Sequence, residues 1–274
     1  MSAPPAPMVS VIMATYNRAD TLPRAIESVL RQTCGDWELL IVDDGSSDAT
    51  QEVLQRFRDS RIHVYHHVQN KGMHAAKNTG LDNIAGEWFT TLDADDEIVP
   101  EALEVLLACA ERTGADAITC NCVDTSTGRF SGVGPTADGW LTPEATAKSR
   151  GDFWGLTRTS LLGGLRFDER VPNHQAPVWI KINRKARRYY IHRALQIIHT
   201  EGADRITTAS RTHDLSRKVD TYFYIGQDSE YLRELRRVDR SEYRRLVLRV
   251  RAARLLRPLL GVRSRRSSGP TEAD

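Results

Sequence analysis

Three carboxylates follow closely after the apolar segment Trp88 to Leu92: Asp93, Asp95 and Asp96. Such a group costs several kcal/mol of mutual repulsion unless a cation lies within it. Mg²⁺ and Mn²⁺ prefer oxygen ligands and can join carboxylates to the oxygens of a diphosphate. The alternative is a solvated acidic turn, because Asp96 precedes a helix expected from Pro100 and would favour its dipole. The aspartates therefore indicate either a divalent-metal site or an ordinary helix start.

A second acidic pair, Asp43 and Asp44, follows the apolar segment Leu39 to Val42. A buried carboxylate at this place can accept a hydrogen bond from the imide N–H of a pyrimidine or from a ribose hydroxyl. Acidic residues and glycine after a strand are also ordinary turn chemistry. After the segment Val9 to Ala14, Tyr16 offers a ring that either stacks on a nucleobase or simply packs. Both loops are candidates for binding a nucleoside.

The first hundred residues alternate between short apolar segments and patterns of helical spacing. Helices are predicted from Leu22 to Leu30 and from Met73 to Leu81. The predicted strands are Val9 to Ala14, Leu39 to Val42, Ile62 to Tyr65 and Trp88 to Leu92. This alternation predicts a mostly parallel, doubly wound sheet. Ligands of such sheets bind beyond the carboxyl ends of the strands, so we expect the polar loops to converge on one edge.

The motifs occur in an order and spacing that resemble those of glycosyltransferase family 2, over roughly Val9 to Leu107. They are Val9 to Arg18, Val42 to Asp48, Asn70 to Gly72, Lys77 to Leu81 and Leu92 to Asp96. The resemblance implies the GT-A fold, an α/β fold with a Rossmann-like, mostly parallel sheet flanked by helices. It also implies an inverting metal-dependent transfer, with Mn²⁺ or Mg²⁺, of a hexosyl or N-acetylhexosaminyl group from a nucleotide-sugar, with UDP-sugars favoured. The acceptor would be a glycan, a lipid-linked glycan or a small natural product.

The resemblance also assigns residues to the donor. Those expected at the nucleotide are Thr15, Tyr16, Asn17, Asp43, Asp44, Lys77 and Asp93. Among them, Asp44 would bind the base, and Asp93 would hold the ribose or the donor sugar. Asp95 would bind the metal. In a closing loop, His199 would approach the metal and Arg205 the diphosphate, whereas the alternative for His199 is a surface histidine.

Inverting transfer needs a general base that deprotonates the acceptor hydroxyl. The resemblance expects an Asp or Glu a few residues before the segment Val178 to Asn183, and the matching residue is Gln175. An amide cannot accept a proton at neutral pH. Three explanations stay open: a Glu-to-Gln change that slows transfer, the neighbour His174 as the base, or a shifted match in which Asp168 or Glu169 serves. Gln175 also favours the alternative of a catalytically silent nucleotide-sugar-binding protein.

The C-terminal region is strongly basic, with thirteen Arg against three acidic residues between Tyr231 and Arg266. Apolar residues recur there at helical spacing, namely Leu248, Ala252, Leu255, Leu256 and Leu259. This pattern predicts either an interfacial helix at an anionic membrane or a helix packed against the acidic remainder of the chain. Nucleic-acid binding fits less well, because aromatic residues are not interleaved with the arginines.

We expect three parts: a nucleotide-sugar-binding half at 1–100, an acceptor-side half at 101–225, and a basic helical extension at 226–274. The first residues lack the basic start of a signal peptide, and the apolar run from Met8 to Ala14 is too short to span a bilayer. The expected location is therefore the cytoplasm, with a peripheral position at the inner face of the membrane as the variant that the basic extension favours.

Overall fold

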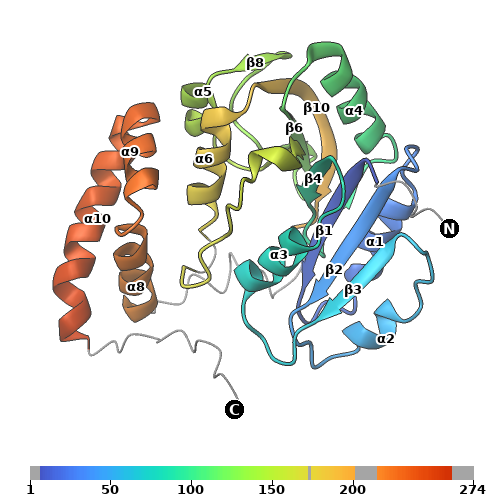
Figure 1. Cartoon of the computed structure of the whole chain (residues 1–274), viewed down its shortest axis with the longest axis horizontal. Helices are drawn as coiled ribbons and strands as arrows, with labels where there is room; N and C mark the ends of the chain where they lie inside the picture. Colours follow the sequence, from blue (N-terminus) through green and yellow to red (C-terminus); the bar gives the residue numbers. More distant parts are fainter. Residues whose placement is uncertain (1–6, 172–173, 201–214, 261–274) are drawn as a thin grey trace. The chain divides into compact units, whose positions relative to one another are not determined.

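The computed structural model describes residues 7–171, 174–200 and 215–260. The chain divides into two compact units, Met1–Ala203 and Asp204–Asp274. The first unit contains the sheet, and the second contains helices (Figure 1). The functional division at residues 100 and 225 stays a prediction.

The first unit is built on one sheet, whose described strands lie in the order β3-β2-β1-β4-β9-β6-β10-β5. Four strands from the first hundred residues form one half of this sheet. They run parallel to one another, as the alternating pattern predicted. They are β1 (Val9–Thr15), β2 (Trp37–Asp43), β3 (Ile62–His66) and β4 (Trp88–Thr91). Their carboxyl ends therefore lie at the same edge of the sheet.

The other half of the sheet is mostly antiparallel. There β9 (Phe153–Arg158) runs opposite to both of its neighbours, β4 and β6 (Ala117–Asp124). The remaining strands are β10 (Arg188–Ile198), parallel to β6, and the short antiparallel β5 (Glu97–Ile98), β7 (Arg129–Phe130) and β8 (Gly139–Leu141). Gly155 permits the β9–β6 approach, since a Cβ there would stand 1.9 Å from the Ile118 carbonyl oxygen.

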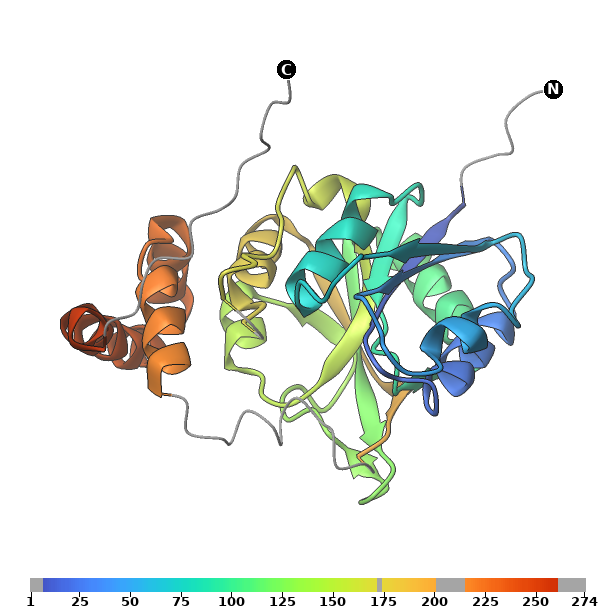
Figure 2. The ribbon, with the colours of Figure 1, turned by 90° about the horizontal axis from the view of Figure 1, so that it is seen from below.

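Helices cover both faces of the sheet (Figure 2). They are α1 (Leu22–Leu30), α2 (Thr50–Leu54), α3 (Met73–Asp82), α4 (Ala102–Thr113), α5 (Pro143–Lys148) and α6 (Ala176–Lys185), besides the short turn η1 (Thr159–Leu161). Along β1, Val11 and Met13 belong to the core with α1 and α4, whereas Ile12 belongs to the core with α3 and α6. Because successive side chains point to opposite faces, burial on both faces requires the continuous apolar run of β1.

The helix α3 lies very close to the sheet. A Cβ on Gly80 would stand 2.4 Å from Cγ2 of Ile12, so a glycine is required at the contact. The helix begins after Gly72, whose φ of 100° suits glycine best. These two glycines hold α3 where its first turns meet the loops at the carboxyl edge of the sheet.

The second unit contains α8 (Leu215–Ile225), α9 (Ser229–Val238) and α10 (Arg240–Leu259). Both α8 and α9 pack on α10. Aspartates cap two of the helices, since Asp228 accepts from the backbone N–H of Tyr231 and Asp239 from those of Ser241 and Glu242. The predicted basic, helical C-terminal region is thus confirmed. None of the described helices is both long and apolar enough to span a bilayer.

Candidate active site

Thr15, the last residue of β1, and the following Tyr16 and Asn17 lie at the carboxyl edge of the sheet. Thr15 is buried, and its hydroxyl has no hydrogen-bond partner among the described residues. The ring of Tyr16 is 44% exposed. Asn17 instead adopts a left-handed backbone, with a φ of 50°, and its side-chain oxygen accepts from the backbone N–H of Ser47. Thr15 and Tyr16 thus keep groups free for a ligand, while Asn17 fastens the loop.

The two aspartates at the carboxyl end of β2 have different surroundings: Asp43 is its last residue, and Asp44 follows it. Asp44 accepts from the backbone N–H groups of Lys71 (2.9 Å) and Gly72 (2.7 Å), and Nδ1 of His67 lies 2.6 Å from the same carboxylate. Asp43 accepts from the backbone N–H of Ser46 through one oxygen. Its other oxygen has only long contacts, 3.3 Å to His66 and 3.4 Å to Gln51. Asp44 is therefore occupied in shaping the loop before α3, and Asp43 retains more capacity for another donor.

Replacing Asp44 by alanine is expected to lower the free energy of unfolding by about 2–4 kcal/mol, because three partly buried donors in the 67–72 loop lose their shared acceptor. Urea unfolding followed by circular dichroism measures this change. Asp20→Ala is the matched control, since Asp20 is exposed and should matter much less for folding. An unchanged unfolding free energy in Asp44→Ala, together with lost UDP affinity, would contradict the structural role.

Lys77 connects α3 to the acidic turn after β4. Its side chain is only 3% exposed, and Nζ donates to Oδ1 of Asp93 at 3.2 Å. A buried ammonium group beside the turn reduces the repulsion among its carboxylates. The two residues that the sequence assigned to the nucleotide side are thus brought together.

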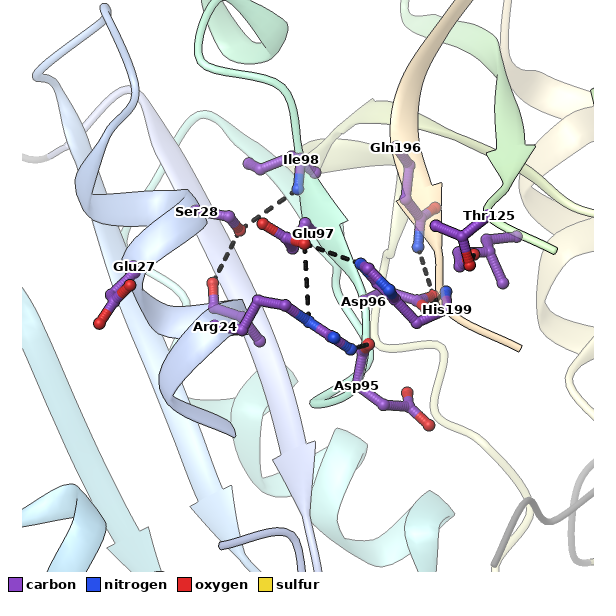
Figure 3. A network of polar contacts seen from close by, with 12 residues as sticks. Arg24, Glu27, Ser28, Asp95, Asp96, Glu97, Ile98, Thr125, Gln196 and His199 are labelled. Carbon is purple, nitrogen blue, oxygen red and sulfur yellow. Dashed lines mark hydrogen bonds and ion pairs between the residues drawn. The ribbon is translucent and has the colours of Figure 1, made fainter. Parts of the chain in front are cut away.

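Figure 3 shows that the carboxylates of the acidic turn do not share one role. Asp96 is buried and accepts from the side-chain amide of Gln196 (2.8 Å) and from the backbone N–H of His199 (3.2 Å). Asp95 contributes its backbone carbonyl to Arg24 at 2.6 Å, whereas its carboxylate points away from the network. Asp96 therefore ties the turn to the end of β10 and leaves the Asp95 carboxylate to project freely.

Glu97 is the centre of an ion-pair cluster beside the turn. It lies 3.5 Å from Arg24, 3.3 Å from Arg31 and 2.7 Å from Nε2 of His199. The Nε2 atom of His199 is therefore engaged by Glu97 rather than directed at a metal in this structure. A metal role for His199 stays a prediction that requires either Nδ1 or a turn of the ring. Arg205 lies outside the described residues.

The acidic turn offers a divalent ion one carboxylate without a protein partner among the described residues, that of Asp95. Among the described residues, no three His, Cys, Asp or Glu side chains form a ready-made metal cluster. Mg²⁺, however, is usually held by one or two carboxylates together with water and substrate phosphates. The Asp95 carboxylate, which makes no hydrogen bond or ion pair within the described residues, fits that kind of site. Lys77 and Arg24 approach the same turn and would face the remaining negative charge.

The predicted base position lies at the start of α6. Gln175 is the N-terminal flanking residue of this helix, and its side-chain oxygen accepts from Nε1 of Trp179 at 3.4 Å. Trp179 in turn stacks on Phe89, with ring centroids 6.3 Å apart. Val178 and Ile182 are buried in the core between α6 and the sheet. The apolar segment that the sequence singled out is therefore the part of α6 that positions Gln175.

The two alternative carboxylates before α6 are both engaged. Asp168 forms an ion pair with Arg170 at 2.7 Å, and Glu169 accepts from the side-chain amide of Asn78 at 2.9 Å. Burial raises the pKa of Asp168, but hydrogen bonds from Arg170 outweigh it, so this pKa lies below its usual value. Asn78 also exchanges two hydrogen bonds with the backbone of Phe167. The helix α3 thereby fixes the loop that contains Phe167 and Glu169.

His74 is a buried histidine beside the loop before α6, and the sequence gave no reason to select it. It is 3% exposed, stacks on Phe167, and its Nδ1 donates to the carbonyl oxygen of Asp168 at 2.9 Å. This bond leaves Nε2 as an acceptor, and Nε2 has no partner among the described residues. Burial lowers the pKa of His74. Burial, and secondarily the charge of His74, lower the pKa of His174 to about 4.

Stability is expected to fall as the pH drops from about 6.5 to about 4, because the unfolded chain then protonates His174 while the folded chain resists it. The loss attributable to His174 should reach about 3 kcal/mol at the acidic end. Urea unfolding at several pH values measures the slope of the unfolding free energy against pH, and His174→Asn should flatten this slope. Removing His63, whose side chain is 48% exposed, should not. An equal slope in the wild type and His174→Asn would contradict the prediction.

A parallel half-sheet that ends in an acidic turn, extended by a mixed half-sheet, defines the GT-A class of glycosyltransferase folds. The chain belongs to glycosyl transferase family 2, whose family model matches residues 10–164. It is 31% identical over 243 residues to the GalNAc(5)-diNAcBac-PP-undecaprenol beta-1,3-glucosyltransferase of Campylobacter jejuni, across 82% of this chain and 78% of that one. The predicted family, fold class and enzyme class are thereby confirmed.

Other similarities agree with this assignment. The chain is 41% identical over 101 residues to the UDP-Glc:alpha-D-GlcNAc-diphosphoundecaprenol beta-1,3-glucosyltransferase WfgD of Escherichia coli, across 37% of this chain and 40% of the relative. The structure of S. aureus TarS 1-349 in complex with UDP-GlcNAc matches with a TM-score of 0.71 at 19% identity, across 90% of this chain and 72% of that one. A mannosyltransferase from Pyrobaculum calidifontis in complex with GDP-Man and Mn²⁺ matches with a TM-score of 0.60 at 19% identity, across 94% and 76%.

Proposed function

We propose that this protein is a metal-dependent inverting glycosyltransferase that moves a sugar from a UDP-sugar to a hydroxyl of a lipid-linked glycan. The observation that carries the proposal is the Asp95 carboxylate, which projects from the turn after β4 without a protein partner among the described residues. It lies in a loop next to the one that begins after Thr15 with Tyr16, because β4 pairs with β1. A carboxylate held in that way suits a cation that joins it to a diphosphate.

The donor would occupy the carboxyl edge of the sheet. Tyr16, with its exposed ring, would stack on the nucleobase, and the unpartnered hydroxyl of Thr15 would take up a polar group of the nucleoside. Asp43 has an oxygen with only long contacts and would accept from the base. Lys77 would hold Asp93 in place for the ribose or the donor sugar. This assignment gives Asp44 an indirect role through the loop that it shapes.

A divalent ion, Mn²⁺ or Mg²⁺, would be held by Asp95 and would supply charge stabilisation for the departing diphosphate. Asp96 and Glu97 would keep the turn rigid from behind, because both are engaged with residues of α1 or β10 and its C-terminal end. The chain's own contribution is therefore to hold one carboxylate free and to secure its neighbours. The Mn²⁺ present with GDP-Man in the Pyrobaculum calidifontis protein supports this choice of cofactor.

The acceptor would approach α6 and the loop before it. Lipid-linked acceptors are favoured because the relatives from Campylobacter jejuni and Escherichia coli both act on undecaprenol-linked glycans. Gln175 stands at the expected base position, and His174, whose low pKa makes it a weak base, is its alternative. A catalytically silent nucleotide-sugar-binding protein on the same fold is the second candidate, and the amide of Gln175 is what favours it. The proposed location is cytoplasmic and peripheral to the membrane.

The proposal is tested by incubating the protein and Mn²⁺ with UDP-glucose, UDP-N-acetylglucosamine or GDP-mannose and an undecaprenyl-diphosphate N-acetylhexosamine acceptor. Release of UDP and the mass of the lipid-linked product are measured. We expect a UDP-sugar to support product formation that chelation of the metal abolishes. If the protein and its Gln175→Glu variant both bind UDP but neither turns over a donor, the enzyme proposal fails and the silent binder stands.

A further inference from the structure

The helix α10 uses only one of its faces to pack within the second unit. Leu246, Val250 and Ala253 are buried there. Arg257 belongs to the same face, since it forms an ion pair with Asp220 at 2.7 Å and lies 4.0 Å above the ring of Phe223. These contacts fix the rotation of the helix about its own axis.

The opposite face of α10 is apolar and exposed. Its leucines are Leu248, Leu255 and Leu259, which are 65%, 74% and 80% exposed. Ala252 lies between them and is exposed as well. With 3.6 residues per turn, the four side chains project within about 40° of their mean direction around the helix axis. The apolar stripe of the C-terminal sequence is thus the outward face of the helix and does not form its packing face.

Arginines border this exposed stripe on both sides. Arg244 and Arg251 project about 40–60° to one side of Leu248, and Arg245 about 60° to the other. Arg244 and Arg251 make no hydrogen bond or ion pair within the described residues, whereas Arg245 pairs with Glu242 at 3.0 Å. Glu242 is the only acidic residue in α10, against seven arginines. The face therefore combines free positive charge with exposed apolar side chains.

We propose that this exposed face of α10 binds the surface of an anionic membrane. Leucines at the centre would enter the boundary between headgroups and acyl chains, and the flanking arginines would contact lipid phosphates. A second copy of the chain fits less well, because two such faces would bring unpaired arginines together. This membrane binding rests on the proposed function, because its benefit is to an enzyme with a lipid-linked acceptor. Such an enzyme, once bound at the membrane, meets its acceptor without leaving the surface.

The test is co-sedimentation of the full chain with vesicles of phosphatidylcholine alone and with vesicles containing about a third phosphatidylglycerol. Binding is expected only to the anionic vesicles, and it should weaken as salt rises from about 0.1 M to 0.5 M. Leu255→Gln and the double variant Arg244→Gln with Arg251→Gln should each weaken binding at least about tenfold. Val133→Gln, at a 71% exposed residue of the first unit, and the double variant Arg56→Gln with Arg58→Gln are the matched controls and should bind as the wild type does.

Three results would overturn the proposal: equal binding to both kinds of vesicle, unchanged binding in the α10 variants, or a dimer in sedimentation analysis that Leu255→Gln dissociates. The last result would assign the face to a second copy of the chain. Hydrolysis of a UDP-sugar in the absence of vesicles separates this proposal from the proposed function. The α10 variants should hydrolyse the donor as the wild type does. A protein that binds vesicles but does not turn over the donor would refute the proposed enzyme activity and leave the membrane binding supported.

Discussion

Replacing Gln175 by glutamate is expected to raise the rate of sugar transfer by about 10²–10⁴-fold, which is the usual contribution of a general base. The substitution changes an amide that cannot accept a proton into a carboxylate of almost the same shape. Its oxygen would still accept from Nε1 of Trp179, so the side chain should keep its position at the start of α6. The rate is measured as UDP release and as lipid-linked product under single-turnover conditions.

Two variants make this result interpretable. Gln175→Ala removes the side chain without adding a base and should not accelerate transfer. His174→Asn tests the neighbouring imidazole, and in the wild-type background it should abolish residual transfer only if His174 is the base. A Gln175→Glu variant that is no faster than the wild type, combined with a sensitive His174→Asn, would move the base to His174. If the carboxylate variant binds UDP normally and neither protein transfers sugar, the silent binder is supported.

Asp95→Asn is expected to reduce transfer by at least about a hundredfold and to remove the effect of Mn²⁺ on UDP affinity. The amide keeps the size of the side chain and loses the negative charge that an ion needs. The backbone carbonyl of Asp95, which accepts from Arg24, stays in place, so the turn itself should remain folded. Calorimetric titration of UDP with and without Mn²⁺ measures the binding, independently of turnover.

Glu52→Gln is the matched control, because Glu52 is an exposed acid on α2 and its loss alters the net charge equally. This variant should keep both metal-dependent binding and transfer. An Asp95→Asn protein that still binds UDP more tightly with Mn²⁺ would refute the metal role of Asp95. The metal would then have to be sought at Asp93 or His199, and the corresponding variants would be titrated in the same way.

The position of the candidate donor residues at one edge of the sheet could be predicted because these residues are local to their strands. Thr15, Asp43 and Asp93 each follow an apolar segment directly, and the carboxyl ends of parallel strands meet at one edge whatever the remaining fold. The loops before α6 could not be placed in the same way. Their position depends on β9 and β10, and these strands pair with partners distant in the sequence.

His74 is the clearest example of a residue whose surroundings could not be predicted from the sequence. Its neighbours in the sequence give it no distinguishing pattern, and its importance comes from Asp168, ninety-four residues away. The exposure of the apolar stripe of α10 could not be predicted from the sequence either. Helical spacing revealed that Leu248 and Leu255 share a face, but only the packing of α8 against Arg257 shows that this face lies opposite the one that packs within the second unit.

The sequence by itself determined the family, the α/β fold and the basic helical C-terminal region, and it placed the candidate nucleotide residues at the ends of neighbouring strands. It could do so because strand periodicity and the turns after strands are local properties. Only the tertiary structure decided which of the similar carboxylates are engaged. Asp44 and Asp96 are held by donors distant in the sequence, whereas the Asp95 carboxylate has no such partner among the described residues. A carboxylate's availability depends on the groups around it, and those are assembled only when the chain folds.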